Sequence, residues 1–247
     1  MARNLLIRGM IAGVIAAVLA TLFARLVAEP QVDLAIAFEA GHASMAHAMN
    51  AAPEPELVSR ATQKGLGLLT AVLLYGAAVG GLFSLVFAAA YGRVGRIGPR
   101  ALAMLLATGA FIAVALVPAL KYPPTPPAVG LHETVGFRTL AYFAMIGTSL
   151  AALVLAVKAA RGLAGRLGAF DAMLAGAALY VAIIVAVGFA LPVIDEVPGD
   201  FPAVLLWTFR IASIGMQALL WAVIGVLFGV MAERVLRAGA TAPRRLH

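Results

Sequence analysis

Long apolar runs alternate with short polar segments along the chain. Six runs of about 20 residues or more span approximately residues 5–28, 65–91, 101–120, 137–157, 172–192 and 203–231. A helix rises about 1.5 Å per residue and satisfies its own backbone, so each run fits the hydrocarbon core of a membrane. The pattern predicts an all-α, polytopic bundle of about six transmembrane helices. Residues 1–247 form a single integral membrane domain, and residues 29–64 form its extracytoplasmic loop.

Composition agrees with this prediction, because 63% of the residues are hydrophobic and 12% are charged, against about 25% charged residues in globular proteins. The mean hydropathy is +1.01. The first run follows Arg3 and Arg8 but is longer than the apolar region of a signal peptide, which favours a retained helix. The chain has no cysteine, which excludes disulfides, thiolate metal ligands and a cysteine nucleophile.

Basic and acidic residues separate by loop, which predicts an orientation in the membrane. Cytoplasmic loops are enriched in Lys and Arg. With both termini in the cytoplasm, the inner segments hold twelve of the eighteen basic residues: Arg3, Arg8, Arg93, Arg96, Arg100, Lys158, Arg161, Arg166, Arg234, Arg237, Arg244 and Arg245. Nine of the eleven acidic residues fall on the other side. The net charge of +7 therefore indicates orientation rather than nucleic-acid binding.

Two further patterns concern packing. Proline-bearing corners at residues 26–30, 116–123 and 191–198 follow the odd-numbered runs, and this rhythm is compatible with a threefold repeat of helical hairpins. The alternative is that apolar helices with similar boundary residues produce this pattern without any true repeat.

Gly76 and Gly80, four residues apart in the second run, predict close packing of this helix against a neighbour.

Candidate metal ligands lie in the segments predicted to face outward. If residues 33–49 form a short helix, Glu39 and His42 share one face at i and i+3, and His47 follows. His132 and Glu133 stand at the start of the fourth run. Imidazole and carboxylate suit first-row divalent ions such as Co, Ni or Zn. The alternatives are a solvated loop with incidental histidines and, for Glu133, a helix-capping role.

Arginines inside apolar runs are stronger candidates for a functional role, because a buried charge in a membrane is costly unless its side chain reaches the interface, pairs with an acid or faces water. Arg138 stands near a predicted boundary, and Arg210 lies deeper in the sixth run. Ser213 and Gln217 follow Arg210 at i+3 and i+7, which predicts a polar stripe on one helix face. The stripe serves either a translocation path or a structural pairing of Arg210 with Glu133, Asp195 or Glu196.

Enzyme motifs do not occur. The chain has no Gly-x-x-x-x-Gly-Lys-[Ser/Thr], no Gly-x-Ser-x-Gly and no His-Glu-x-x-His. A membrane enzyme acting on a lipid would need acids or a histidine gathered at the helix ends, and only His132 and Glu133 approach that arrangement. The sequence therefore predicts a protein that is not an enzyme and has no bound cofactor.

Four segments together resemble the CbtA family of predicted cobalt transporter subunits: Leu74–Arg100, Leu116–Gly130 with "LVPALKYPPTPPAVG", Glu133–Thr139 with "ETVGFRT", and Glu196–Gln217 with "EVPGDFPAVLLWTFRIASIGMQ". The resemblance covers nearly the whole chain. It implies a multi-pass protein of the bacterial inner membrane that takes up cobalt for cobalamin synthesis. It also implies a small, single-span, His-bearing partner of the CbtB type. Many members have a His-rich first outer loop, whereas this chain has only His42 and His47, so the partner would supply much of the ion capture.

Together these observations predict a transporter in the lipid bilayer that binds a divalent ion, Co²⁺ or alternatively Ni²⁺, at an acidic outer vestibule and passes it inward. Glu39, His42, His47, His132 and Glu133 are the expected ligands. Further carboxylates would raise the local cation concentration: Glu29, Asp195, Glu196 and Asp200. Arg138, Arg210, Ser213 and Gln217 would form the polar interior. The rival hypothesis is a membrane scaffold or assembly subunit that does not itself transport.

Overall fold

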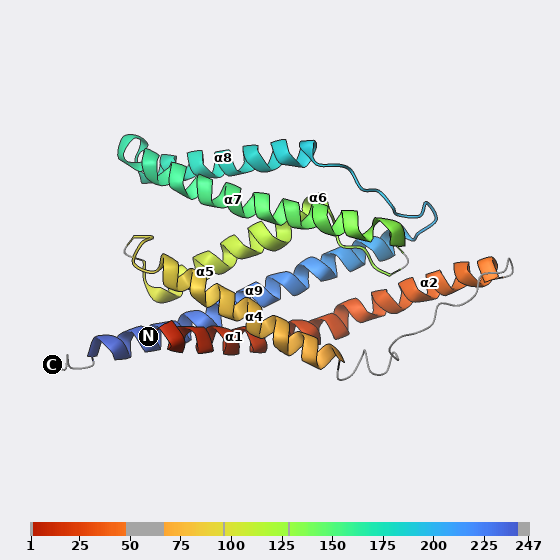
Figure 1. The fold of residues 1–247 in the computed structure, drawn as a ribbon, viewed down its shortest axis with the longest axis horizontal. Helices are drawn as coiled ribbons and strands as arrows, with labels where there is room; N and C mark the ends of the chain where they lie inside the picture. The colour runs from red at the N-terminus through yellow and green to blue at the C-terminus, as the bar shows by residue number, and fades with distance from the viewer. Residues whose placement is uncertain (1, 48–66, 96, 128, 242–247) are drawn as a thin grey trace. The chain divides into compact units, whose positions relative to one another are not determined.

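The chain folds into long helices, and in its described part six of them are long and apolar enough to cross a membrane. The computed structural model describes residues 2–47, 67–95, 97–127 and 129–241 (Figure 1). Within these residues every regular element is helical, which confirms the predicted fold class. The six candidate spans are Ala2–Gly41, Leu69–Ala90, Pro99–Lys121, Val135–Leu167, Ala169–Ala190 and Ala203–Arg237. Much of the loop between the first two spans, residues 48–66, lies outside the described residues.

The first helix continues well past the predicted boundary at residue 28. Helix α1 (Ala2–Phe23) passes through a π-helical segment (Ala24–Ala28) into α2 (Glu29–His47) without a break. Pro30 has no backbone N–H and crowds the preceding turn of an ordinary α-helix. The wider π turn, closed by the Glu29 N–H donating to Ala24 O, precedes it. Residues 29–47 are therefore a helical extension of the first span rather than a separate loop helix.

The third span also has a π-helical segment next to a proline. Helix α5 (Pro99–Ala110) leads through a second π segment (Phe111–Leu116) into the short α6 (Val117–Lys121), which contains Pro118. The Val117 N–H donates to Ile112 O across the wide turn. The third predicted corner differs, because α8 ends at Ala190 and residues 191–200 leave the helix. Two of the three corners thus share a construction, and the threefold repeat remains an interpretation.

Contacts divide the chain into two compact units. The first comprises Met1–Pro30, Ala40–Thr108 and Gly215–His247, and the second comprises Gln31–Glu39 and Gly109–Ile214. Helix α9 (Ala203–Thr241) contributes its first turns to the second unit and the rest to the first.

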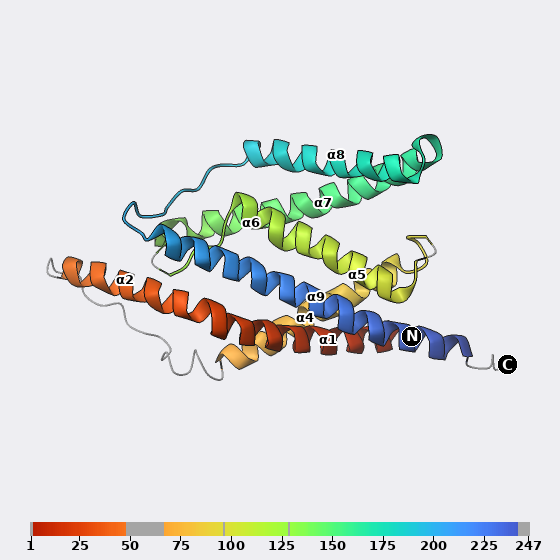
Figure 2. The same cartoon turned by 180° about the vertical axis from the view of Figure 1, so that it is seen from behind.

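In the first unit α1 lies along α4 (Leu68–Ala90) at very short range (Figures 1 and 2). Gly9 and Gly13 of α1 meet Gly76 and Gly80 of α4, and a Cβ added at Gly76 would lie 2.6 Å from Gly13 O. The close packing predicted from Gly76 and Gly80 is confirmed, with glycines on both helices.

The same unit has an aromatic core between α4 and α9. Phe83 and Phe87 of α4 meet Phe228 of α9 edge-on, with ring centroids 5.4 and 5.0 Å apart. Offset or edge-to-face rings at this separation add to the energy of apolar burial. Gly225 and Gly229 of α9 lie against α5, where a Cβ at Gly225 would approach Ala107 Cβ to 2.8 Å. These contacts fix α4, α5 and α9 around one core.

The second unit contains the hairpin of α7 (Val135–Leu167) and α8 (Ala169–Ala190), which run side by side (Figures 1 and 2). Gly168 joins them with φ +83°, a conformation that favours glycine. Gly176 of α8 packs on Ala156 and Ala160 of α7. A hydrogen bond of 2.8 Å between the hydroxyls of Ser149 and Tyr180 ties the two helices.

A small apolar cluster gathers the segments at the far end of this hairpin. It contains Ala35 of α2, Val129 of the α6–α7 loop, and Phe201 and Leu205 at the start of α9. Phe38 of α2 meets Phe201 edge-on, with centroids 5.0 Å apart. The cluster therefore holds the α6–α7 loop and the α8–α9 loop close together, beside the candidate site.

Candidate functional site

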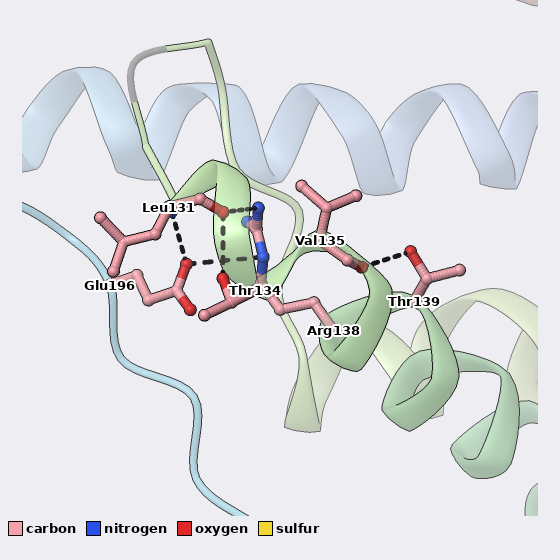
Figure 3. A network of polar contacts seen from close by, with 6 residues as sticks. All are labelled: Leu131, Thr134, Val135, Arg138, Thr139 and Glu196. Carbon is pink, nitrogen blue, oxygen red and sulfur yellow. Dashed lines mark hydrogen bonds and ion pairs between the residues drawn. The ribbon is translucent and has the colours of Figure 1, made fainter.

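The candidate site lies where the α6–α7 loop (residues 122–134) meets the α8–α9 loop (residues 191–202). We call it the corner network and define it by Leu131, Thr134, Arg138 and Glu196 (Figure 3). The first loop ends in a 3-10 turn (His132–Thr134) that leads into α7, and Arg138 stands in the first turns of α7. Glu196 comes from the second loop. Two segments about 60 residues apart in sequence thus share one polar site.

The carboxylate of Glu196 links the two loops. Its Oε2 accepts a hydrogen bond of 2.8 Å from the Leu131 backbone N–H and lies 3.4 Å from Arg138 Nε. The second distance describes an ion pair rather than a directed hydrogen bond, because Nε has no hydrogen-bond partner in the described structure. The side chains are 13% exposed for Glu196 and 26% for Arg138, so the pair is only partly screened by solvent.

The carbonyl oxygen of Leu131 is the second acceptor. It accepts from Arg138 Nη2 at 3.0 Å and from the Thr134 hydroxyl at 3.0 Å. Arg138 therefore bridges a carboxylate of one loop and a carbonyl of the other (Figure 3). Its guanidinium has a fixed planar fork of donors, which suits two acceptors on different segments.

Gly130 makes room for this guanidinium. The residue adopts φ +106°, which disfavours any side chain. A Cβ added there would collide with Nη1 of Arg138 and lie 2.7 Å from its Cζ. The glycine thus serves both the turn and the seating of Arg138.

Hydrogen bonding lowers the pKa of Glu196 below its ordinary value of 4.5. The Thr134 hydroxyl contributes most, followed by the Leu131 amide, and the charge of Arg138 acts in the same direction, while partial burial opposes them. A hydroxyl has one proton, so Thr134 donates either to Glu196 or to the Leu131 carbonyl at any moment. Glu196 is held in its ionised form.

A second tie joins the same loops near the end of α6. The Tyr122 hydroxyl donates a hydrogen bond of 3.0 Å to Pro192 O, and burial raises the pKa of this phenol. Lys121 Nζ lies 5.7 Å from the Tyr122 ring centroid, within cation–π range. The Tyr122 hydroxyl thus ties the end of α6 to the α8–α9 loop.

The residues predicted as metal ligands are not brought together among the described residues. Glu39 and Glu133 are exposed, and no group of three or more His, Asp or Glu residues in the described part of the chain could hold a metal ion. The side chains of His42, His47 and His132 lie outside the described residues. Their ligand role stays a prediction. Of the predicted vestibule acids, Asp195 and Asp200 are exposed, Glu29 is half-buried, and only Glu196 belongs to the corner network.

The predicted polar stripe lies along α9 on the flank between its buried and exposed sides. Arg210, Ser213 and Gln217 are half-buried, between a buried side with Leu205 and an exposed side with Trp207. Ser213 donates to Phe209 O of its own helix at 2.9 Å. Arg210 Nε is buried without a hydrogen-bond partner in the described structure. Of its three suggested partners, Glu196 pairs with Arg138, and Glu133 and Asp195 are exposed.

Sequence reasoning missed a charged cluster in the first unit. Glu233 of α9 is 15% exposed and pairs with Arg100 Nε of α5 at 2.5 Å and with Arg237 of α9 at 2.9 Å. All three had been considered only as orientation signals. The i,i+4 spacing of Glu233 and Arg237 was visible in the sequence, whereas the pairing with Arg100 required the packing of α5 on α9.

The six long apolar helices of the described residues define a multi-pass membrane protein. The corner network places a carboxylate and an arginine where two of its loops meet. The chain belongs to the CbtA family, since the family model described as "Probable cobalt transporter subunit (CbtA)" matches residues 2–233. This confirms the predicted family. Comparison with curated proteins and with solved structures found no match.

Proposed function

We propose that this chain mediates uptake of divalent cobalt across the bacterial inner membrane, with a link to cobalamin synthesis. The family match over residues 2–233 carries the proposal, because the family is described as a probable cobalt transporter subunit. The same description implies a partner, for which a small His-bearing membrane protein is our candidate. The protein acts as a transport subunit and not as an enzyme.

The distribution of charge supports this direction of transport. With both termini in the cytoplasm, the corner network and the acids Asp195 and Asp200 face outward. Carboxylates at that surface would concentrate divalent cations before they enter. His42, His47 and His132 would supply nitrogen ligands, which suit Co²⁺ and Ni²⁺ better than oxygen alone.

Flux in liposomes tests the proposal. Purified protein, with and without the candidate partner, should carry Co²⁺ at a rate above that of empty vesicles. The variant His42→Ala/His47→Ala should slow Co²⁺ flux if the α2 end supplies ligands. Met45→Ala, between the two histidines, is its matched control. Absence of Co²⁺ and Ni²⁺ flux in both preparations contradicts the proposal.

A scaffold that positions a metal-carrying partner is the second candidate. One observation favours it: the described residues contain no group of three metal-binding side chains. In that case Arg210→Ala should lower the folding yield and leave cellular cobalt accumulation per folded molecule unchanged. If Arg210 serves a transport path, the same variant should lower accumulation per folded molecule.

A further inference from the structure

The guanidinium of Arg138 is surrounded by oxygen atoms of the kind that hold metal cations. Glu196 Oε2 lies 3.4 Å from Nε, and the Leu131 carbonyl lies 3.0 Å from Nη2. The Thr134 hydroxyl touches the same carbonyl and also stabilises the Glu196 carboxylate. A carboxylate, a carbonyl and a hydroxyl are all oxygen ligands for hard divalent cations. Figure 3 shows these groups around one positive charge.

The space occupied by the guanidinium is provided by the backbone. Gly130 turns through φ +106° and has no Cβ where Nη1 and Cζ of Arg138 lie. The Leu131 amide separately fixes the carboxylate at 2.8 Å. The oxygen atoms are therefore held by loop geometry as well as by the arginine, so they remain near one another when the arginine moves.

Arg138 is held at this place by the Nη2 hydrogen bond to the Leu131 carbonyl and by the ion pair with Glu196. Its side chain is long and 26% exposed, and its Nε makes an ion pair without a directed hydrogen bond. An ion pair of this exposure is of modest strength, so a divalent cation with twice the charge competes for the same carboxylate.

We propose that Glu196, the Leu131 carbonyl and Thr134 form a transient binding site for divalent cations, with Arg138 as an internal occupant that the arriving ion displaces. The inference deepens the proposed function and rests on it for its physiological role as an entry site. Water completes the coordination shell, because the protein supplies few ligands. Binding is weak and discriminates little among Mg²⁺, Mn²⁺ and Co²⁺, as suits an ion that must leave again. Selection for cobalt then takes place at nitrogen ligands elsewhere.

Short-range quenching of a fluorophore by Co²⁺ measures binding at this place. The chain has no cysteine, so Val193→Cys gives a single labelling site in the α8–α9 loop, at a residue that is 84% exposed. Val193 is three residues from Glu196, within about 10 Å along the chain. Phe170→Cys, 66% exposed at the start of α8, is the matched control label, because 20 helical residues separate it from the end of α8 by about 30 Å.

The variants to compare, in the labelled full chain in detergent, are Arg138→Ala, Glu196→Gln and both together. Removing the competing charge should tighten Co²⁺ binding by about tenfold in Arg138→Ala, which corresponds to about 1.4 kcal/mol. Adding Glu196→Gln should abolish the gain. Millimolar guanidinium or Mg²⁺ should reverse the quenching in Arg138→Ala. Arg138→Gln, which keeps a donor for Leu131 O, is the second variant if the alanine protein does not fold.

Three results would overturn the site. They are an affinity unchanged by both position-138 variants, a gain that survives Glu196→Gln, and Co²⁺ quenching that excess Mg²⁺ does not reverse. The last result would assign the ion to a nitrogen ligand instead of these oxygens. Liposome flux separates this inference from the proposed function. Binding as expected without flux contradicts the transporter alone, and flux with binding indifferent to Arg138 and Glu196 contradicts the site alone.

Discussion

Gly76 on α4 lies directly against Gly13 on α1, so close that a Cβ at Gly76 would stand 2.6 Å from the Gly13 carbonyl oxygen. The contact is backbone to backbone, and neither helix has a flexible group that could yield. Without a hydrophobic force between helices in lipid, such close packing is a main source of their association. The Gly9 and Gly80 pair extends the contact by one turn.

Gly76→Ala should therefore destabilise the protein by about 1–3 kcal/mol, the usual cost of overpacking. Unfolding in mixed detergent micelles measures the change. Gly147→Ala is the matched control, because Gly147 also lies within a membrane helix but has nothing within 4 Å of an added Cβ. That control should be neutral or slightly stabilising, since alanine favours helix by up to about 1 kcal/mol over glycine. Equal effects at both positions would refute the glycine contact.

The corner network should lose stability in acid. The pKa of Glu196 is lowered below 4.5 in the folded protein, so its contribution is present above that pH and disappears as the pH falls through the lowered value. The difference in unfolding temperature between the wild type and Glu196→Gln should stay constant near neutrality and shrink below about pH 4.5. Glu133→Gln, at an exposed position, serves as the control. A difference that does not shrink in acid would contradict the assigned pairing.

Arg100 and Glu233 should be energetically coupled. Glu233 is largely buried, but Arg100 is 60% exposed, so solvent screens the pair. A double-mutant cycle with Arg100→Ala and Glu233→Ala should give about 0.2–1 kcal/mol. The cycle between Arg100 and Arg234, an exposed neighbour of Glu233, should give a coupling near zero. A vanishing coupling in the first cycle would mean that α5 is positioned on α9 by packing alone.

Removing the hydrogen bond between the two hydroxyls of the α7–α8 hairpin should cause a small, measurable loss of stability. Tyr180→Phe removes the 2.8 Å hydrogen bond to Ser149 and keeps the ring. Polar contacts between membrane helices average about 0.6 kcal/mol, so the variant should be destabilised by about that amount. Tyr75→Phe, at a ring that is 52% exposed, should change the unfolding free energy less. The idea fails if Ser149→Ala and Tyr180→Phe are fully additive.

Orientation can be read from single cysteines in this cysteine-free chain. Val193→Cys and Phe170→Cys lie at opposite ends of α8. If both termini are cytoplasmic, an impermeant thiol reagent added to intact cells should label position 193 and not position 170. Labelling of both positions after permeabilisation is the control. The reverse pattern would invert the predicted topology.

The helical spans were predictable because a membrane-spanning helix needs about 20 mostly apolar residues in a row, and such a run can be read directly from the sequence. Gly76 and Gly80 likewise indicated a close contact, but the partner glycines on α1 depended on which helices become neighbours. Arg138 and Glu196 were both candidates for the outer surface, in different roles. Their pairing depended on the path of two proline-bearing loops, which residue spacing does not encode.

The first helix boundary was missed for a related reason. Pro30 indicated a corner, and an α-helix would be disturbed there, whereas the π turn before it lets the helix continue. The polar stripe at Arg210 was predictable from i+3 and i+7 spacing, but its half-buried flank position was not. Helical periodicity places residues on a common face without saying what covers that face.

The two π turns have a consequence for how the helices display their side chains. A wide turn holds about one residue more than an α turn, so it rotates everything after it by about 100° relative to an uninterrupted helix. The turns fall at residues 24–28 and 111–116, beside the points where the chain leaves the first compact unit at Pro30 and Thr108. The turn therefore changes which helix positions are buried: α1 buries Gly9 and Ala16, and α2 after the turn buries Ala35.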